Sequence, residues 1–588
     1  MSPSLLGPPE LQSTTTVDSH PKIKSQPSIT PESQTTVTSY ISTGNPCLDF
    51  FHVAPGTPQE ELIQRLQLSY QNNPLKTLKL ICNLRGVKGC GKNDKEGFYH
   101  SALWLHKNHP KTLANNVGRV ASFGSLKDLL EILFRVLEGF DVRKRMKDAW
   151  EIEKPNFFAK KWALTKSRLS ELDNQKRKAA KAEKKVCKAK KAIDRYSHDP
   201  EYKYLFDCIC DVFADLLRKD LELLRGDMGE FRGKLSLAAK WCPSLDSSYD
   251  ESLLICESIA KKVFPREEYL EYEGIEEAHY AYRVRTRLRK EVLVPLRKEL
   301  ELPEVYMCAK RWRDIPYESV HSLAMHLGKK VFLKRDCNGF EEYLEEVRDG
   351  ESTISAGALL PHEIICGVSQ GSLKLDQVLQ LQWTRMVDDL GKQGSLINCI
   401  GVCDNVMNDV SVALLLLVSE LTVDPWKGKV VSKDEGVVEI NGEKLDSKVD
   451  FVRGMYSYGS IDLHEVFDRV LDFAVEKKLG DEQMIRRLFV FTETEIVGQF
   501  WGKREYAEMQ RKFLEKGYEK VPEIVFWNVK NSVGGFNVRC DEPGVGVVSG
   551  FSKNLMGLFV HELAEFTPEA VMDAAISSPD YDLLEIYD

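Results

Sequence analysis

The chain has 588 residues, of which 43% are hydrophobic and 29% charged, with a formal net charge of −8 at pH 7. This length and apolar content predict more than one soluble domain with a sizeable core. The 14 Cys contain no CxxC pair and the 12 His do not cluster with Cys or carboxylates, which excludes a zinc ribbon and a secreted disulfide scaffold. We therefore expect reduced thiols, a cytoplasmic or nuclear location and no membrane span, because the apolar run at residues 412–418 is too short.

The charge is unevenly divided along the chain. From residue 396 to the end there are 20 Lys and Arg against 34 Asp and Glu, a net charge of −14, which leaves +6 for the rest. A mildly basic front suits a phosphate-bearing partner, whereas the acidic rear does not.

Residues 1–40 are rich in Ser, Thr and Pro, lack the apolar core of a secretory signal, and predict a disordered tail. In residues 41–395, apolar residues recur at helical spacing, as at Leu62, Leu66 and Leu78. Short helices separated by Pro and Gly predict an array of stacked helices of the HEAT type, although no strict repeat is present.

Residues 86–93, with the sequence GVKGCGKN, fit the phosphate-loop pattern G-x-x-x-x-G-K. A phosphate loop follows a buried strand, whereas residues 78–85 predict a helix. Asn93 also stands where Ser or Thr would bind magnesium. We therefore expect a Gly-rich turn between two helices rather than a nucleotide site.

The most basic segment lies at residues 160–195, where 14 Lys and Arg stand against four Asp and Glu. Within it, residues 176–185 are almost entirely charged residues and Ala, which predicts a solvated helix with no stripe facing a core. We expect a basic insertion at about residues 158–196. A nuclear-import signal or a contact with phosphate backbone are the functional alternatives.

A second basic helix is predicted at residues 276–300, where residues 282–290 have the sequence YRVRTRLRK. More cations follow at residues 310–313 and 329–330. Cations interleaved with Tyr and Trp can bind nucleic acid through phosphate contacts and stacking. The alternative is a solvated helix face neutralised by Glu276, Glu277 and Glu291. The candidate RNA-binding residues are Arg283, Arg285, Arg287, Arg289, Lys290, Lys310, Arg311 and Arg313.

From residue 396 the apolar pattern changes to alternating strands and helices. Strands are predicted at 396–403, 488–491, 523–529 and 545–548, and helices at 409–421 and 504–516. This alternation predicts a doubly wound α/β domain, whose ligands lie at the carboxyl ends of the strands.

Asp404 follows the first predicted strand and is the first candidate ligand of a cation, with Asn408 and Glu493 completing the set. Val406 stands between them where a hydroxyl ligand would be needed, and it offers no oxygen. We therefore expect a degenerate site for Mg²⁺ and no other cofactor.

The chain resembles an uncharacterised plant family that joins a TROVE-like helical module to a von Willebrand factor A domain, and more distantly the Ro ribonucleoprotein autoantigen. The resemblance covers about residues 41–588 and includes TGNPCLDFF at 43–51 and VSGFSKNL at 548–555. It implies a curved array of helical repeats over 41–395 and a von Willebrand factor A domain over 396–588. In the Ro relatives the helical ring binds RNA, and the A domain holds an adhesion-type metal site. The resemblance therefore implies structured RNA, and not DNA, as the expected partner of the helical part. The loop beginning at Asp404 departs from the D-V-S-G-S-M of similar family members.

These features together predict a non-catalytic binding or scaffold protein, with RNA on the helical part and a protein partner on the A domain. One alternative is a metal-dependent adhesion-type interaction module without RNA. A more remote alternative is a hydrolase or ATPase, based on the Gly-rich loop and on the acidic residues Asp404, Glu493 and Glu495.

Overall fold

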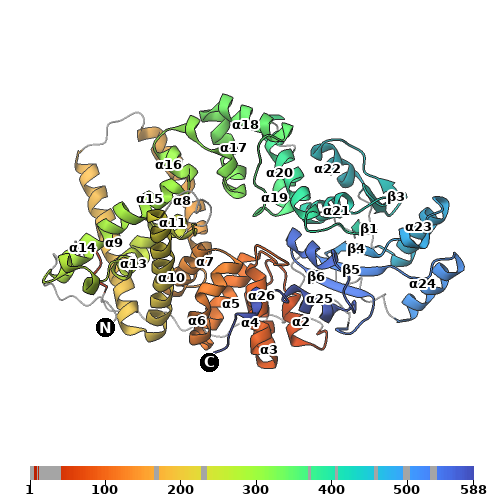
Figure 1. Ribbon diagram of the computed structural model, residues 1–588, viewed down its shortest axis with the longest axis horizontal. Helices are drawn as coiled ribbons and strands as arrows, with labels where there is room; N and C mark the ends of the chain where they lie inside the picture. The colour runs from red at the N-terminus through yellow and green to blue at the C-terminus, as the bar shows by residue number, and fades with distance from the viewer. Residues whose placement is uncertain are drawn as a thin grey trace. The chain divides into compact units, whose positions relative to one another are not determined.

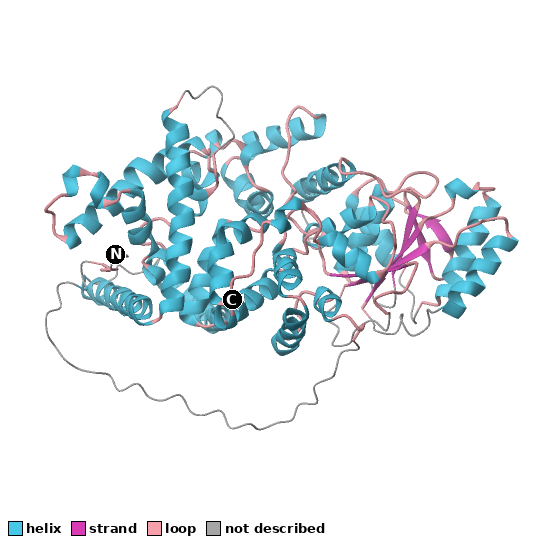
Figure 2. Ribbon diagram, turned by 60° about the horizontal axis from the view of Figure 1, so that its bottom comes forward, coloured by secondary structure: helices cyan, strands magenta, loops and turns pink. Residues whose placement is uncertain are grey.

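The computed structural model describes residues 5–8, 11, 42–164, 171–226, 235–368, 373–403, 408–455, 461–493, 503–529 and 539–588. These residues form mainly helices, with a small parallel sheet in the C-terminal part (Figures 1 and 2). The chain divides into two compact units. The first contains residues 1–36, 102–302 and 585–588, and the second contains residues 37–101 and 303–584.

This division differs from the boundary at residues 395 and 396 that the change of sequence pattern predicts. The second unit combines the sheet with helices from both ends of the predicted helical region. Helix α5 (Lys95–Asn108) spans the point where the chain passes from one unit to the other. No helix in the described ranges is both long enough and apolar enough to cross a membrane.

The first unit is helical. Its elements are α6 (Pro110–Phe123), α7 (Leu126–Glu138), α8 (Val142–Leu164), α9 (Glu171–His198), α10 (Pro200–Arg225), α11 (Ala238–Trp241), α12 (Ser248–Leu253), α13 (Ile255–Val263), the 3₁₀ turns η1 (Arg266–Glu268) and η2 (Leu270–Tyr272), α14 (Glu277–Arg287), the π-helical segment η3 (Leu288–Leu293) and α15 (Val294–Glu299).

Helix α10 is the centre of this unit and packs against α6, α9 and α13. Asp199 caps its first turn by accepting hydrogen bonds from the backbone N–H groups of Glu201 and Tyr202. Its buried residues recur every four positions along one face, as an amphipathic helix requires. They include Leu205, Ile209, Phe213 and Leu217.

The basic helix α9 is not the unpacked insertion that its composition predicts. Ala189, Ala192 and Tyr196 form a buried stripe in its second half, and α9 packs against α10 and α12. Three of its lysines are paired with acidic residues of the same unit. The pairs are Lys185 with Asp246 at 2.9 Å, Lys188 with Glu251 at 3.7 Å and Lys191 with Glu138 at 2.8 Å. Counting charge alone missed this stripe because its members are small or aromatic.

Both ends of the chain contribute to the first unit. Residues 5–8 fall inside the predicted tail, yet the backbone N–H groups of Leu6 and Gly7 donate to the buried carboxylate of Glu257 at 2.9 and 3.1 Å. The rest of that predicted tail lies outside the described residues, apart from residue 11. At the other end, the Asp588 carboxylate accepts hydrogen bonds from the N–H groups of Lys111 and Thr112, both at 2.9 Å, at the start of α6.

The second unit begins with α2 (Pro46–Phe51), α3 (Gln59–Asn72) and α4 (Pro74–Arg85). After residue 302 it continues with α16 (Pro303–Cys308), η4 (Trp312–Asp314), η5 (Tyr317–Ser319), α17 (Ser322–Arg335), α18 (Cys337–Asp349), α19 (Pro361–Ile365) and α20 (Leu373–Gly391). Aromatic residues of η5, α17 and α18 form a hydrophobic cluster of their own around Tyr317, Phe332 and Phe340.

Four parallel strands form the sheet, in the order β1-β4-β5-β6. They are β1 (Cys399–Cys403), β4 (Arg487–Thr492), β5 (Glu523–Asn528) and β6 (Val545–Ser549). The antiparallel hairpin of β2 (Lys429–Ser432) and β3 (Gly436–Glu439) packs beside β1. The remaining elements are α21 (Asp409–Leu421), α22 (Leu445–Gly454), α23 (Leu463–Glu476), η6 (Asp481–Gln483), α24 (Lys503–Glu515), η8 (Lys553–Phe559), α25 (Pro568–Ala575) and α26 (Pro579–Asp582).

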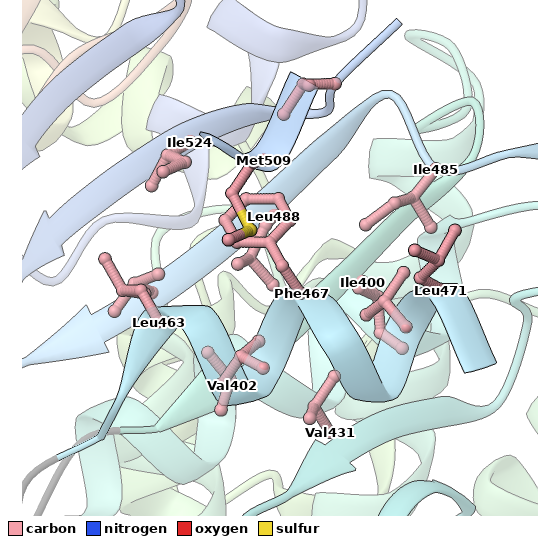
Figure 3. Close-up of a cluster of buried hydrophobic side chains, with 14 of the residues drawn as sticks. Ile400, Val402, Val431, Leu463, Phe467, Leu471, Ile485, Leu488, Met509 and Ile524 are labelled. Atoms are coloured by element: carbon pink, nitrogen blue, oxygen red, sulfur yellow. The ribbon is translucent and has the colours of Figure 1, made fainter. Parts of the chain in front are cut away.

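Helices cover both faces of this sheet. On one face, alternate strand residues such as Ile400, Leu488 and Ile524 pack against Phe467 of α23 and Met509 of α24 (Figure 3). On the other face lie α21 and η8. A Cβ added at Gly401 of β1 would stand 2.6 Å from a Leu415 methyl group, and the Phe489 and Phe559 rings meet edge to face. The predicted α/β arrangement is therefore confirmed as a parallel sheet covered by helices on both sides.

Helix α21 explains the apolar run at residues 412–418. All seven of these residues are buried, because α21 packs against β1 as well as α19, α20 and α22. A helix that is apolar on all sides belongs inside a core. The run is therefore the central helix of the α/β part.

Candidate functional site

The candidate RNA-binding residues on α14 and η3 divide into cations with partners and cations without. Arg285 is largely buried and its guanidinium contacts Asp250 at 3.0 Å and Asp246 at 3.6 Å. Asp250 is itself buried and accepts a hydrogen bond from the backbone N–H of Cys256 at 3.0 Å. Arg285 therefore attaches α14 to the preceding helices and is not available to a ligand.

Arg287 has both ion pairs and aromatic contacts. Its guanidinium pairs with Glu271 at 2.5 Å and Glu291 at 2.7 Å. It also lies over two aromatic rings, 4.4 Å from the centroid of Phe264 and 4.6 Å from that of Tyr269. This part of the basic helix matches the alternative in which acidic neighbours, Glu291 among them, neutralise the face.

The remaining cations of this helix are exposed. Arg283, Arg289 and Lys290 all point to solvent, and none of them has an ion pair or a hydrogen bond to a described residue. Next to them, the ring of Tyr282 is 65% exposed. An exposed aromatic ring beside unpaired cations offers stacking and phosphate contacts in one place.

The backbone widens in the middle of this segment. Residues Leu288–Leu293 form a π-helical turn between α14 and α15, with Leu288, Val292 and Leu293 buried and Arg289 and Lys290 exposed. The periodicity of the sequence predicts one continuous helix and misses this turn. Single π-helical turns are uncommon and recur at functional sites.

The other three candidate residues lie in the second unit, not with the first five. Lys310 and Arg313 are exposed without an ion pair among the described residues, while Arg311 pairs with Asp314 at 2.8 Å. Arg311 also lies 5.1 Å from the centroid of the Tyr306 ring. The sequence places all eight cations within 31 positions, but they belong to separate compact units.

At the carboxyl edge of the sheet, the structure brings together two of the three candidate metal ligands. The Asn408 amide Nδ2 donates a hydrogen bond to the Glu493 carboxylate. Asn408 is also the N-cap of α21, because its Oδ1 accepts from the backbone N–H of Ser411 at 2.8 Å. Asp404, Val406 and Glu495 lie outside the described residues.

The described side chains at this edge do not suit a divalent cation. The one oxygen of Asn408 that could act as a ligand already caps a helix, and its amide nitrogen faces the carboxylate of Glu493. A hard cation takes six or more oxygen ligands. No group of three or more His, Cys, Asp or Glu in the described parts of the chain is placed to hold a metal ion.

The Gly-rich loop at residues 86–93 joins α4 to α5 and is the helix–helix turn that its context predicts. Gly86 and Gly91 are in backbone contact, since a Cβ on Gly91 would stand 2.3 Å from the Gly86 oxygen. The Lys92 ammonium turns into the core, where it donates to the carbonyl oxygens of Phe51 and Val53, the latter at 2.9 Å. Burial lowers the pKa of Lys92 to about 7. This lysine cannot reach a phosphate.

Lys553 is buried in a similar way in η8. Its ammonium donates to the carbonyl oxygens of Gly357 at 2.8 Å and Leu359 at 2.6 Å, with Ala356 at 3.4 Å. Burial lowers its pKa to about 8. The segment before α19 is thereby tied to the α/β core.

The fold defines a mostly helical protein that carries a small parallel-sheet region. The chain belongs to the family of the domain of unknown function DUF2828, which matches residues 33–396, and a second domain of unknown function, DUF7788, matches residues 394–578. It is also similar to the "Uncharacterized protein L728" of Acanthamoeba polyphaga mimivirus, with 28% identity over 389 residues. That similarity covers 61% of this chain and 64% of the viral protein. No solved structure matches the chain.

Proposed function

We propose that this protein is a non-catalytic scaffold that binds structured RNA through the exposed face of α14 and η3. The observation that carries the proposal is the group formed by Tyr282, Arg283, Arg289 and Lys290. These three cations are exposed and unpaired among the described residues, and they stand beside an exposed ring. We call this group the RNA face.

The partners of the neighbouring arginines support the same proposal. Arg285 and Arg287 fix the helix to acidic and aromatic residues of its own unit, so the RNA face is presented on a rigid element. A rigid element loses little conformational entropy when it binds. In this proposal the two paired arginines position the helix, and the three exposed cations contact phosphates.

We propose in addition that the sheet region is a von Willebrand factor A domain and that the helical part is TROVE-like. Support for the first comes from the parallel order β1-β4-β5-β6, with the β2–β3 hairpin beside β1, and from helices on both faces. The A domain would bind a protein partner without a metal, since Asn408 and Glu493 are committed to each other. In the described residues we find no observation that favours the metal-dependent alternative.

Binding of the full-length chain to a structured RNA, measured by filter retention over a series of salt concentrations, tests the RNA proposal. The variant carries Arg283→Ala, Arg289→Ala and Lys290→Ala together. Each lost phosphate contact should reduce the slope of log affinity against log salt by about 0.7 to 0.9, so the triple variant should lose about 2 to 3.

The matched control leaves the RNA face intact and removes three exposed, unpaired lysines from the second unit. It carries Lys334→Ala, Lys427→Ala and Lys516→Ala together. It changes net charge by the same amount. We expect it to keep the slope of the wild type. Equal losses in both triple variants would mean that only overall charge matters, and a wild type that binds no RNA at low salt would refute the proposal.

A further inference from the structure

A cavity of about 260 Å³ in the second unit lies among α17, α19 and α20. Its lining is unusually rich in ionisable side chains. They are His326, Lys329, Lys330, Glu363, Cys366 and Asp376.

Lys329 distinguishes this cavity from the other places where the protein buries a lysine. The described residues contain four buried lysines, and three of them have clear partners. Lys92 and Lys553 donate to backbone carbonyls, and Lys261 pairs with Glu257 at 3.0 Å and Glu277 at 2.8 Å. Lys329 is only 9% exposed, yet it has no hydrogen bond or ion pair to any described residue.

The stem of Lys329 is buried, because Met325, Lys329 and Phe332 share the buried face of α17. Its ammonium is not enclosed by protein atoms. The unpaired charge faces the cavity, where a ligand could supply the missing partner.

The other lining groups indicate the chemistry of that ligand. Lys330 adds a second positive charge, and the His326 imidazole, which interacts with the side chain of Gln382, lies in the same lining. Burial lowers the pKa of His326, so its imidazole is neutral at pH 7. Two ammonium groups beside an imidazole suit the oxygens of an anion.

The carboxylates in the lining limit the charge that the cavity can accept. Glu363 already accepts a hydrogen bond from the backbone N–H of Leu360 at 2.8 Å. Asp376 lies near Lys329 and acts on its charge but forms no ion pair with it, while burial and the charge of Lys330 lower the pKa of Lys329. A small ligand with a single oxyanion group is therefore favoured over a polyanion.

We propose that this cavity binds a small molecule through its oxyanion group, a phosphate or a carboxylate, with Lys329 as the principal contact. Lys330 and His326 supply the secondary contacts. The site is separate from the RNA face, which belongs to the other compact unit.

The test measures binding of inorganic phosphate and of acetate to the full-length chain by thermal shift, with sodium chloride at matched ionic strength as reference. Phosphate or acetate should raise the unfolding midpoint of the wild type beyond the chloride reference. The stronger of the two identifies the oxyanion class. Lys329→Gln should weaken the affinity at least about tenfold, because a charge-assisted hydrogen bond is lost.

Two further variants separate ligand binding from a structural role. Lys329→Arg keeps the charge and should retain binding, whereas the exposed Lys334→Gln on the same helix should behave like the wild type. A wild type that responds to neither anion beyond chloride overturns the proposal. So does an anion response that Lys329→Gln leaves unchanged, because the site would then lie elsewhere.

Discussion

Two regions of the second unit bury the stem of a lysine but differ in whether its ammonium has hydrogen-bond partners. In η8, the Lys553 ammonium is surrounded by backbone carbonyl oxygens of residues 356–359. In α17, the stem of Lys329 is buried as well, but its ammonium reaches a cavity and has no partner among the described residues. The first arrangement is a structural tie, and the second is the site that we propose for an oxyanion. Burial alone therefore does not separate a structural lysine from a candidate ligand contact, and the partners of the ammonium must be compared as well.

The strongest test of this comparison replaces each lysine by Met. Lys553→Met should lower the free energy of unfolding by about 3 kcal/mol, because the buried carbonyls lose their donor. Lys329→Met, measured without added oxyanion, should leave stability unchanged or raise it, because an apolar side chain replaces an unpaired charge. Urea unfolding followed by tryptophan fluorescence measures both.

The exposed Lys427→Met is the control for these two variants and should change stability by less than about 0.5 kcal/mol. The essential result is a loss of stability in Lys553→Met without a loss in Lys329→Met. A large loss of stability in Lys329→Met, as large as in Lys553→Met, would show that Lys329 has a structural partner after all.

The same distinction between partnered and unpartnered cations extends to the basic helix of the first unit. Arg287→Ala should lower the free energy of unfolding by about 1.5 kcal/mol, because its ion pairs and its packing on Phe264 and Tyr269 are lost. Arg283→Ala should change it by less than about 0.5 kcal/mol. Thermal or urea unfolding of the two single variants provides the measurement, and equal effects would remove the distinction.

The smallest expected effect concerns Asn408 at the sheet edge. Asn408→Ala should lower the free energy of unfolding by about 1 kcal/mol, because α21 loses its N-cap. Asn408→Ser keeps a capping oxygen and should lose less. Magnesium at millimolar concentration should shift the unfolding midpoint of neither variant nor of the wild type. A clear upward shift of the wild type would mean that the edge still binds a cation.

Much of the α/β part could be predicted from the sequence. The helix predicted at residues 409–421 has those bounds in the structure, and the strands predicted at 488–491 and 523–529 differ by a residue or so. These elements are nearly all apolar and fully buried, so the pattern of the sequence directly records their environment. The turn at residues 86–93 was also predictable, because the sequence before it predicts a helix and a phosphate loop would follow a strand.

The division of cations into those with and without partners could not be predicted. Arg283, Arg285 and Arg287 stand at every second position, yet Arg283 is unpaired. Apart from Glu291, the acidic partners of the other two arginines come from residues 246–250 and 271. The burial of Lys329 likewise depends on how α17 packs in three dimensions. The stripe of α9 was hidden by the lysines around it. In each case the deciding contact is distant in sequence, and composition carries no record of it.

Ultraviolet crosslinking of RNA to the full-length protein in its own cells, with mass spectrometry of the linked peptide, tests the central claim most directly. The proposal predicts recovered RNA linked to a peptide that contains Tyr282, and a reduced yield when Arg283, Arg289 and Lys290 are replaced by Ala. Recovery of protein partners without RNA, or crosslinks confined to residues 303–584, would contradict it.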